Sequence, residues 1–120
     1  IQSFDLMSVP TVYRESKGLS ILEAMANGVP VVQPAHGSFP ELIEDTGAGL
    51  LFEPLNVHAL ADALRQLIRD PELALQCGRQ GHAAVRDRYH AAAMAQQTID
   101  LYSRVIAEHR GTRAKELSEA

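Results

Sequence analysis

The chain has 120 residues, of which 46% are hydrophobic and 22% are charged, with a formal net charge of −4. This length corresponds to one small domain with a core, and it is short for an enzyme whose cleft lies between two lobes. No apolar run of roughly 18 residues is present, so the sequence predicts no membrane span, and its start has no signal-peptide pattern. A single cysteine, Cys77, forms no internal disulfide, so we expect a reducing compartment and a cytoplasmic protein.

Charge is distributed unevenly along the chain. Residues 1–57 contain two basic residues, Arg14 and Lys17, against seven acidic ones, whereas residues 58–120 contain nine basic and eight acidic ones. This pattern excludes the basic footprint of a nucleic-acid-binding protein. The five histidines are scattered and no CxxC pair is present, so we expect neither a metal site nor a cofactor.

The first half of the chain alternates between expected strands and expected helices. Short apolar or β-branched runs bounded by proline or glycine predict three buried strands, at residues 5–10, 29–34 and 48–54. A helix is expected at residues 18–28, and a second is expected after Ser38 as its cap, with Pro40 and Glu41 in its first turn. This order predicts an α/β fold, a Rossmann-like, doubly wound parallel sheet with flanking helices.

The C-terminal third is expected to be helical. Asn56 is the predicted cap of a helix that ends near Asp70, and Asp70 and Pro71 begin another helix that ends near Tyr89. A last helix follows, and the polar residues 111–120 are expected to be a frayed tail after a domain spanning residues 1–110. The predicted core face of the helix after Asn56 consists of Leu60, Leu64, Leu67 and Ile68. That of the last helix consists of Met94, Thr98, Leu101, Val105 and Ile106.

The helix predicted at residues 18–28 carries apolar side chains around most of its circumference, so it should be buried nearly all round. Ser20, Glu23 and Asn27 interrupt this pattern along one face, because they are spaced at i, i+3 and i+7. Two interpretations of Glu23 stay open at this point. Either it binds a polar ligand, or it faces solvent on a half-exposed helix.

The loop before this helix has the features of an anion site. In an open α/β sheet, ligands bind outside the carboxyl ends of the strands, where loops lead into helices. Gly18 begins the helix, so the first backbone N–H groups are free to face an anion, and Lys17 and Arg14 add positive charge. Glu15 and Glu23 flank this phosphate half-site. Two such carboxylates suit the hydroxyl groups of a nucleotide sugar.

The motif E-x7-E, from Glu15 to Glu23, is followed by EAMANGVPVV and GSFPE. In this order the segments resemble the C-terminal nucleotide-sugar-binding domain of retaining GT-B glycosyltransferases of family 4. The resemblance extends from about Phe4 to Tyr102 and includes GAGLLFEP and DPEL. E-x7-E alone is a weak signal, whereas the whole order of motifs is specific.

The resemblance implies a role for each site residue. It implies that Glu23 binds the ribose hydroxyls of the donor nucleotide and that Glu15, the catalytic candidate, contacts the donor sugar near its reacting face. The backbone N–H groups of Gly18 and Leu19 are implied to hold the distal phosphate, and Ser20 is adjacent on the polar face. Lys17 stands where the family usually has an aromatic residue, and we expect its charge to serve the diphosphate.

The resemblance also implies partners. The expected ligand is a nucleoside-diphosphate sugar, and an N-terminal acceptor-binding domain is expected outside this chain. We expect the longer protein to be cytoplasmic, or peripheral at the membrane. The alternative is a non-catalytic binding or self-associating module that forms a homodimer through an exposed sheet edge.

His36 and Tyr13 have two interpretations each. His36 is read as a loop residue rather than a catalytic base. Tyr13 packs on the donor, or it is a simple loop aromatic. Glu15 and Lys17 also have an alternative reading, as an ordinary loop carboxylate and a surface lysine.

Overall fold

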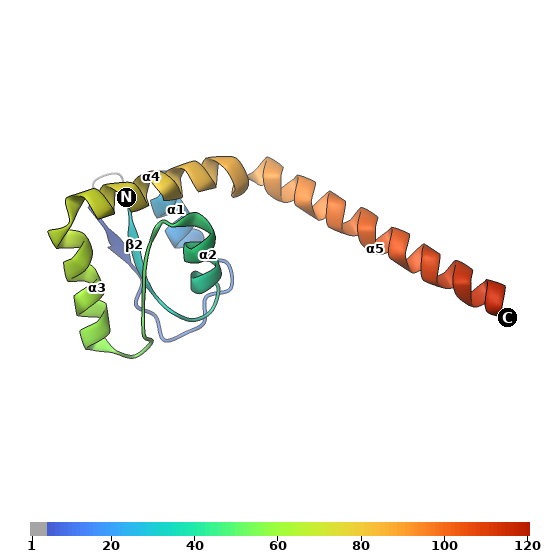
Figure 1. Cartoon of the computed structure of the whole chain (residues 1–120), viewed down its shortest axis with the longest axis horizontal. Coiled ribbons are helices and arrows are strands. Elements are labelled where there is room, and N and C mark those ends of the chain that lie inside the picture. Colours follow the sequence, from blue (N-terminus) through green and yellow to red (C-terminus); the bar gives the residue numbers. More distant parts are fainter. Residues whose placement is uncertain (1–4) are drawn as a thin grey trace. The chain divides into compact units, whose positions relative to one another are not determined.

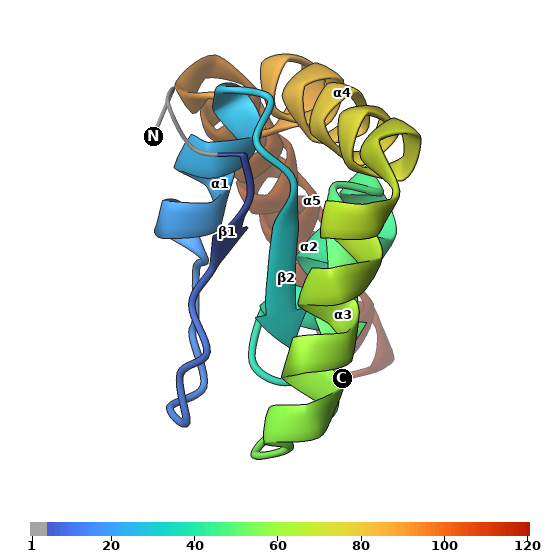
Figure 2. The same ribbon diagram turned by 90° about the vertical axis from the view of Figure 1, so that its left-hand side faces the viewer.

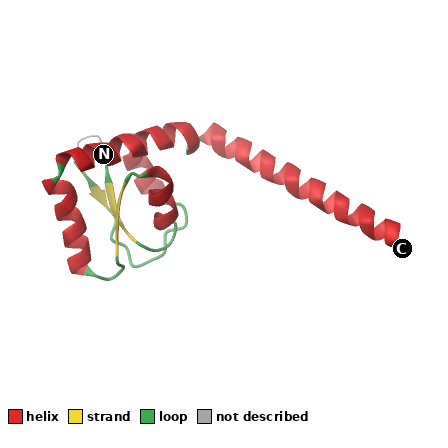
Figure 3. Cartoon of the chain, viewed as in Figure 1, coloured by secondary structure: helices red, strands yellow, loops and turns green. Residues whose placement is uncertain are grey.

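A computed structural model describes residues 5–120. Residues 1–4, which include Phe4 at the start of the family resemblance and the start of the predicted domain 1–110, lie outside the described residues. The elements of the described part are β1 (Met7–Ser8), α1 (Leu19–Ala26), β2 (Val31–Pro34), α2 (Phe39–Thr46), β3 (Gly49–Phe52), α3 (Val57–Arg69), α4 (Pro71–Arg88) and α5 (Ala91–Glu119). The predicted alternation of strands and helices is confirmed (Figure 3).

The three strands form one parallel sheet in the order β1-β2-β3. All four residues of β2 are buried, which is typical of a central strand covered on both faces. β1 is shorter than the predicted strand at residues 5–10. Pro10 has no N–H group for a ladder, and the N–H of Val9 donates to the side chain of Gln33 instead.

Helices cover both faces of this sheet. α1 and α2 lie on one face and α3 on the other, as Figures 1 and 2 show. On the α3 face, Val32 and Phe52 pack in a buried cluster with Ala63, Leu67 and Cys77. This arrangement confirms the predicted helix-covered parallel sheet.

α4 crosses the amino ends of the strands. A Cβ atom added at Gly78 would lie 2.2 Å from the carbonyl oxygen of Gly28, which precedes β2. One added at Gly81 would lie 2.8 Å from the Cβ of Ala48, which precedes β3. Glycine at these two positions lets α4 approach this end of the sheet, and the carboxyl ends of the strands are left to the loops.

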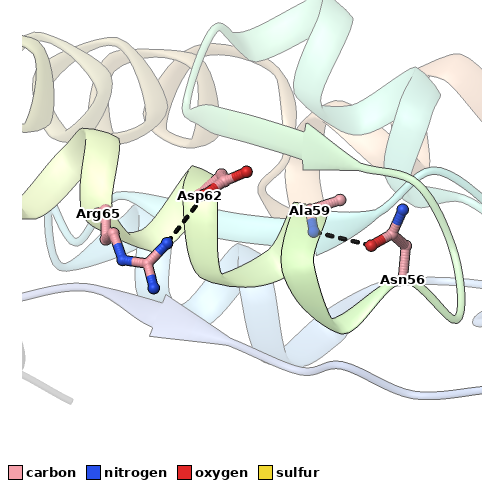
Figure 4. Close-up of polar contacts among 4 residues, drawn as sticks. All are labelled: Asn56, Ala59, Asp62 and Arg65. Carbon is pink, nitrogen blue, oxygen red and sulfur yellow. Dashed lines mark hydrogen bonds and ion pairs between the residues drawn. The ribbon is translucent and has the colours of Figure 1, made fainter.

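The predicted caps of α3 and α4 are confirmed. The Asn56 side chain accepts a hydrogen bond from the N–H of Ala59 at 2.9 Å, and the exposed ion pair between Arg65 and Asp62 follows on the same helix (Figure 4). Asp70 Oδ1 accepts from the N–H of Leu73 at 3.0 Å. The prediction that Ile68 belongs to the core face of α3 is wrong, because this side chain is 66% exposed.

The predicted cap of α2 is only partly confirmed. Ser38 precedes α2, but its side chain makes no capping hydrogen bond, and its hydroxyl is buried without a partner. Pro40 and Glu41 do lie in the first turn.

Contacts divide the chain into two units, Ile1–Asp87 and Arg88–Ala120. In the second unit α5 continues to Glu119 and so includes most of the residues predicted to be a frayed tail. Residues 112–119 include Arg, Ala, Lys, Glu and Leu, which are good helix formers. α5 has no buried residue, so its predicted core face is exposed in this structure. No helix between residues 5 and 120 is long and apolar enough to cross a membrane.

Candidate functional site

The loop between β1 and α1 leaves the carboxyl end of the sheet and carries the Glu15 carboxylate. Glu15 Oε1 accepts hydrogen bonds from the backbone N–H groups of Lys17, at 3.0 Å, and Gly18, at 3.1 Å. One carboxylate oxygen therefore organises the entry into α1. Both of these hydrogen bonds are accepted by Oε1, so the second carboxylate oxygen, Oε2, takes no part in them.

These backbone hydrogen bonds favour the ionised form of Glu15. The N–H of Lys17, and then that of Gly18, lower the pKa of the Glu15 carboxyl below its usual value, and a smaller desolvation effect opposes them. Hydrogen bonds donated to a carboxylate favour its ionised form. Glu15 therefore keeps its negative charge to a lower pH than an unperturbed carboxyl group does.

The start of α1, where the sequence predicts an anion site, leaves backbone N–H groups without partners in the described part of the chain. Gly18 is buried and has a φ of +68°, a left-handed conformation that favours glycine. Within the described residues, the N–H groups of Leu19 and Ser20 have no hydrogen-bond partner. Unpaired amides at the positive end of a helix dipole attract an anion.

Lys17 and Arg14 place two cations on this loop. Both side chains are exposed, and neither forms an ion pair with another residue in the described part of the chain. They are therefore free to face an anionic ligand at the start of α1.

Glu23 lies on the exposed side of α1. Only Ile21, Ala24 and Met25 of this helix are buried, so the expectation of a helix buried nearly all round is wrong. Leu19 is 62% exposed. The α1 side chains that face away from the sheet are open to solvent, and the role of Glu23 as a ligand-binding residue stays a prediction.

The loop between β2 and α2 lies directly against the Glu15 loop. The N–H of Ser38 donates to the carbonyl oxygen of Glu15 at 2.8 Å. Gly37 has a φ of +61°, and a Cβ atom added there would lie 2.6 Å from the same carbonyl oxygen. The glycine of the GSFPE motif therefore permits a close approach between the two loops.

Two polar residues, His36 and Gln33, make contacts with the Glu15 loop that the sequence does not predict. His36 Nε2 lies 2.9 Å from the carbonyl oxygen of Thr11, and Gln33 Oε1 accepts from the N–H of Val9 at 3.2 Å. Gln33 is fully buried in the central strand. A glutamine within an otherwise apolar strand was the signal that could have identified it.

The family model described as glycosyl transferases group 1 matches residues 1–84. The chain belongs to this family. Among curated group 1 relatives, it is 36% identical over 103 residues to D-inositol 3-phosphate glycosyltransferase of Corynebacterium glutamicum, covering 86% of this chain and 24% of that protein. It is 33% identical over 95 residues to N-acetyl-alpha-D-glucosaminyl L-malate synthase of Bacillus anthracis, and the match covers 79% of this chain and 25% of that protein.

Solved structures give the same result for the fold. Sucrose-phosphate synthase from Thermosynechococcus elongatus matches with a TM-score of 0.73 and 34% identity, over 87% of this chain and 26% of that one. Anabaena HepE, solved in complex with UDP, matches with a TM-score of 0.77 and 27% identity, over 85% of this chain and 28% of that one. The group 1 chain described here thus spans about a quarter of the curated relatives it matches.

Proposed function

We propose that this chain is the donor-binding part of a longer retaining glycosyltransferase, which transfers a sugar from a nucleoside-diphosphate sugar to an acceptor. One observation carries the proposal: unpaired amides at the start of α1 lie next to the ionised Glu15 on one loop. The family membership and the UDP complex of the similar HepE protein support it. The acceptor-binding domain belongs to the part of the enzyme outside this chain.

The start of α1 binds the diphosphate in this proposal. The N–H groups of Leu19 and Ser20 face the distal phosphate, and Lys17 adds a full positive charge. The N–H of Gly18 is engaged by Glu15 in this structure, so it reaches the phosphate only when that carboxylate releases it. As the bond from the sugar to the diphosphate breaks, these groups stabilise the charge that develops on the leaving group.

The two carboxylates divide the donor between them. Glu15 uses one oxygen to hold its own loop and presents the other to the donor sugar, where positive charge develops in an oxocarbenium-like transition state. Glu23, on the exposed side of α1, accepts hydrogen bonds from the ribose hydroxyls. In this proposal the nucleoside-diphosphate sugar enters as the substrate, and we expect no cofactor.

The family match favours this transferase over the alternative of a non-catalytic binding module. The single cysteine, Cys77, is buried and forms no disulfide within the chain. We propose a cytoplasmic enzyme, or one that is peripheral at the membrane.

The test is a calorimetric titration of the intact protein that carries this chain, with UDP, GDP and ADP in turn. We expect one of them to bind, and Glu23→Gln to weaken that binding by roughly 1–3 kcal/mol, the scale of a hydrogen bond to a charged group. Glu44→Gln, which removes an exposed carboxylate from α2, is the matched control. Equal affinities for the parent and Glu23→Gln would exclude the proposed role of Glu23, and no binding of any nucleotide would contradict the proposed function.

A further inference from the structure

Two side chains at the carboxyl end of β2, Gln33 and His36, contact the backbone of the β1–α1 loop. Gln33 Oε1 accepts from the N–H of Val9 at 3.2 Å, and His36 Nε2 lies 2.9 Å from the carbonyl oxygen of Thr11. Because a carbonyl oxygen can only accept, the His36 proton in this contact is on Nε2. Together the two side chains fix the beginning of the β1–α1 loop at two points.

The same two side chains leave polar atoms unsatisfied. Gln33 Nε2 and His36 Nδ1 are both buried and have no hydrogen-bond partner in the structure. A buried polar atom without a partner costs free energy, and an apolar side chain of similar shape would avoid that cost. The stability of the core alone therefore does not account for Gln33 and His36, whereas a task in holding the loop does.

The loop they hold has few other fixed points at its start. β1 pairs with β2 at only two residues, and Pro10 has no N–H group to donate. Residues 12–14 are exposed. Further along, the contact between Ser38 and Glu15 fixes the end of the loop, so the β2–α2 segment holds it at both ends.

We propose that Gln33 and His36 are positioning residues for donor binding, which keep Glu15 and the first amides of α1 in their binding geometry. This inference rests on the proposed function. A loop that is ordered before the ligand arrives loses less conformational entropy on binding. Breaking either contact should therefore weaken donor binding while the rest of the domain stays folded.

The experiment compares four variants of the intact protein that carries this chain. His36→Leu and Gln33→Met each remove one contact and put an apolar side chain of similar size in its place. His36→Gln, by contrast, retains an N–H donor that can reach Thr11. Thr46→Val is the matched control, because the Thr46 hydroxyl also makes two buried hydrogen bonds, to Leu42 and Ala48, at the other end of the sheet. The measurements are nucleoside-diphosphate affinity by calorimetry, melting temperature, and hydrogen exchange of the Lys17 and Gly18 amides.

We expect His36→Leu and Gln33→Met to weaken nucleotide binding about three- to tenfold, the scale of one lost hydrogen bond. Exchange at the Lys17 and Gly18 amides should become faster. His36→Gln should restore most of both properties. Thr46→Val should lower the melting temperature but change neither the nucleotide affinity nor the exchange of the Lys17 and Gly18 amides.

Unchanged affinity in His36→Leu, or an equal loss of affinity in Thr46→Val, would overturn the proposal. The exchange measurement separates this proposal from the proposed function. If the parent protein binds no nucleoside diphosphate, the proposed function fails, and exchange still decides whether the two side chains hold the loop. Unchanged exchange in His36→Leu would show that they do not.

Discussion

Glu15 orders its own loop through one carboxylate oxygen. Oε1 accepts from two consecutive backbone N–H groups, those of Lys17 and Gly18, at the turn into α1. An ordinary loop carboxylate on a flexible side chain would have no fixed direction. These two hydrogen bonds therefore orient the charge that the proposed chemistry uses.

The lowered pKa of Glu15 makes its contribution to stability depend on pH. Since the carboxyl has a lower pKa in the folded chain than in the unfolded one, its stabilising effect is present above the usual carboxyl pKa of about 4.5. The effect is lost as the pH falls through the folded pKa. In urea unfolding, the free-energy difference between the parent chain and Glu15→Gln should be constant from pH 7 to about 5 and shrink at lower pH. Glu44→Gln controls for the loss of one charge. A difference that does not change with pH would contradict the stabilising role of the hydrogen bonds from Lys17 and Gly18 to Glu15.

Spacing and the family resemblance indicate Glu15, Gly18 and Glu23 as candidate site residues, and that assignment stays a prediction. Their surroundings could not be predicted from the sequence. The bonds from Glu15 to its own loop depend on backbone angles, such as the positive φ of Gly18, that spacing alone does not determine. The exposure of Glu23 likewise depends on how deeply α1 packs on the sheet.

At the scale of elements, the site is formed by two loops that approach each other closely. Gly37 makes this possible, because any side chain there would meet the backbone of Glu15. The contact joins residues more than twenty positions apart, so periodicity in the sequence gave no sign of it. Strand and helix order, by contrast, followed directly from the alternation of apolar runs with glycine and proline.

Gly37→Ala should destabilise the chain strongly. A left-handed φ costs a non-glycine residue roughly 1–3 kcal/mol, and the added Cβ would also lie 2.6 Å from the Glu15 carbonyl oxygen. Gly111→Ala is the control, since nothing lies within 4 Å of its added Cβ in α5, and it should stabilise the helix by up to about 1 kcal/mol. Chemical unfolding measures both. Equal stability of Gly37→Ala and the parent would refute the close contact of the two loops.

At the scale of the whole molecule, β1 and β3 are the two edge strands of the described sheet, and β1 has one free side. Among the described residues β1 pairs only with β2. An open pocket of about 530 Å³ lies at the amino ends of β1 and β2, where α3 is followed by α4, and its lining includes Leu6 and the exposed Ile68 and Leu75. An apolar surface beside an unpaired strand favours association with another chain or segment.

We predict that the 120-residue chain forms a homodimer through this edge. Sedimentation velocity should show a dimer that Ile68→Glu or Leu75→Glu converts to a monomer, because a buried unpaired charge disfavours the interface. Ile106→Glu, on the exposed face of α5, should leave the dimer intact. A monomeric parent chain, or a dimer that only Ile106→Glu disrupts, would contradict the prediction.

The measurement that tests the account most directly is steady-state kinetics of the intact enzyme with Glu15→Ala and Glu23→Ala. If Glu15 acts on the reacting sugar, Glu15→Ala should lower kcat about a hundredfold or more with little change in the donor KM, because the lost interaction belongs to the transition state. Glu23→Ala should instead raise the donor KM, because its contact with the ribose is made in ground state and transition state alike. An equal, modest rise in KM for both variants, or no effect of Glu15→Ala, would contradict the assignment of Glu15 as the catalytic carboxylate.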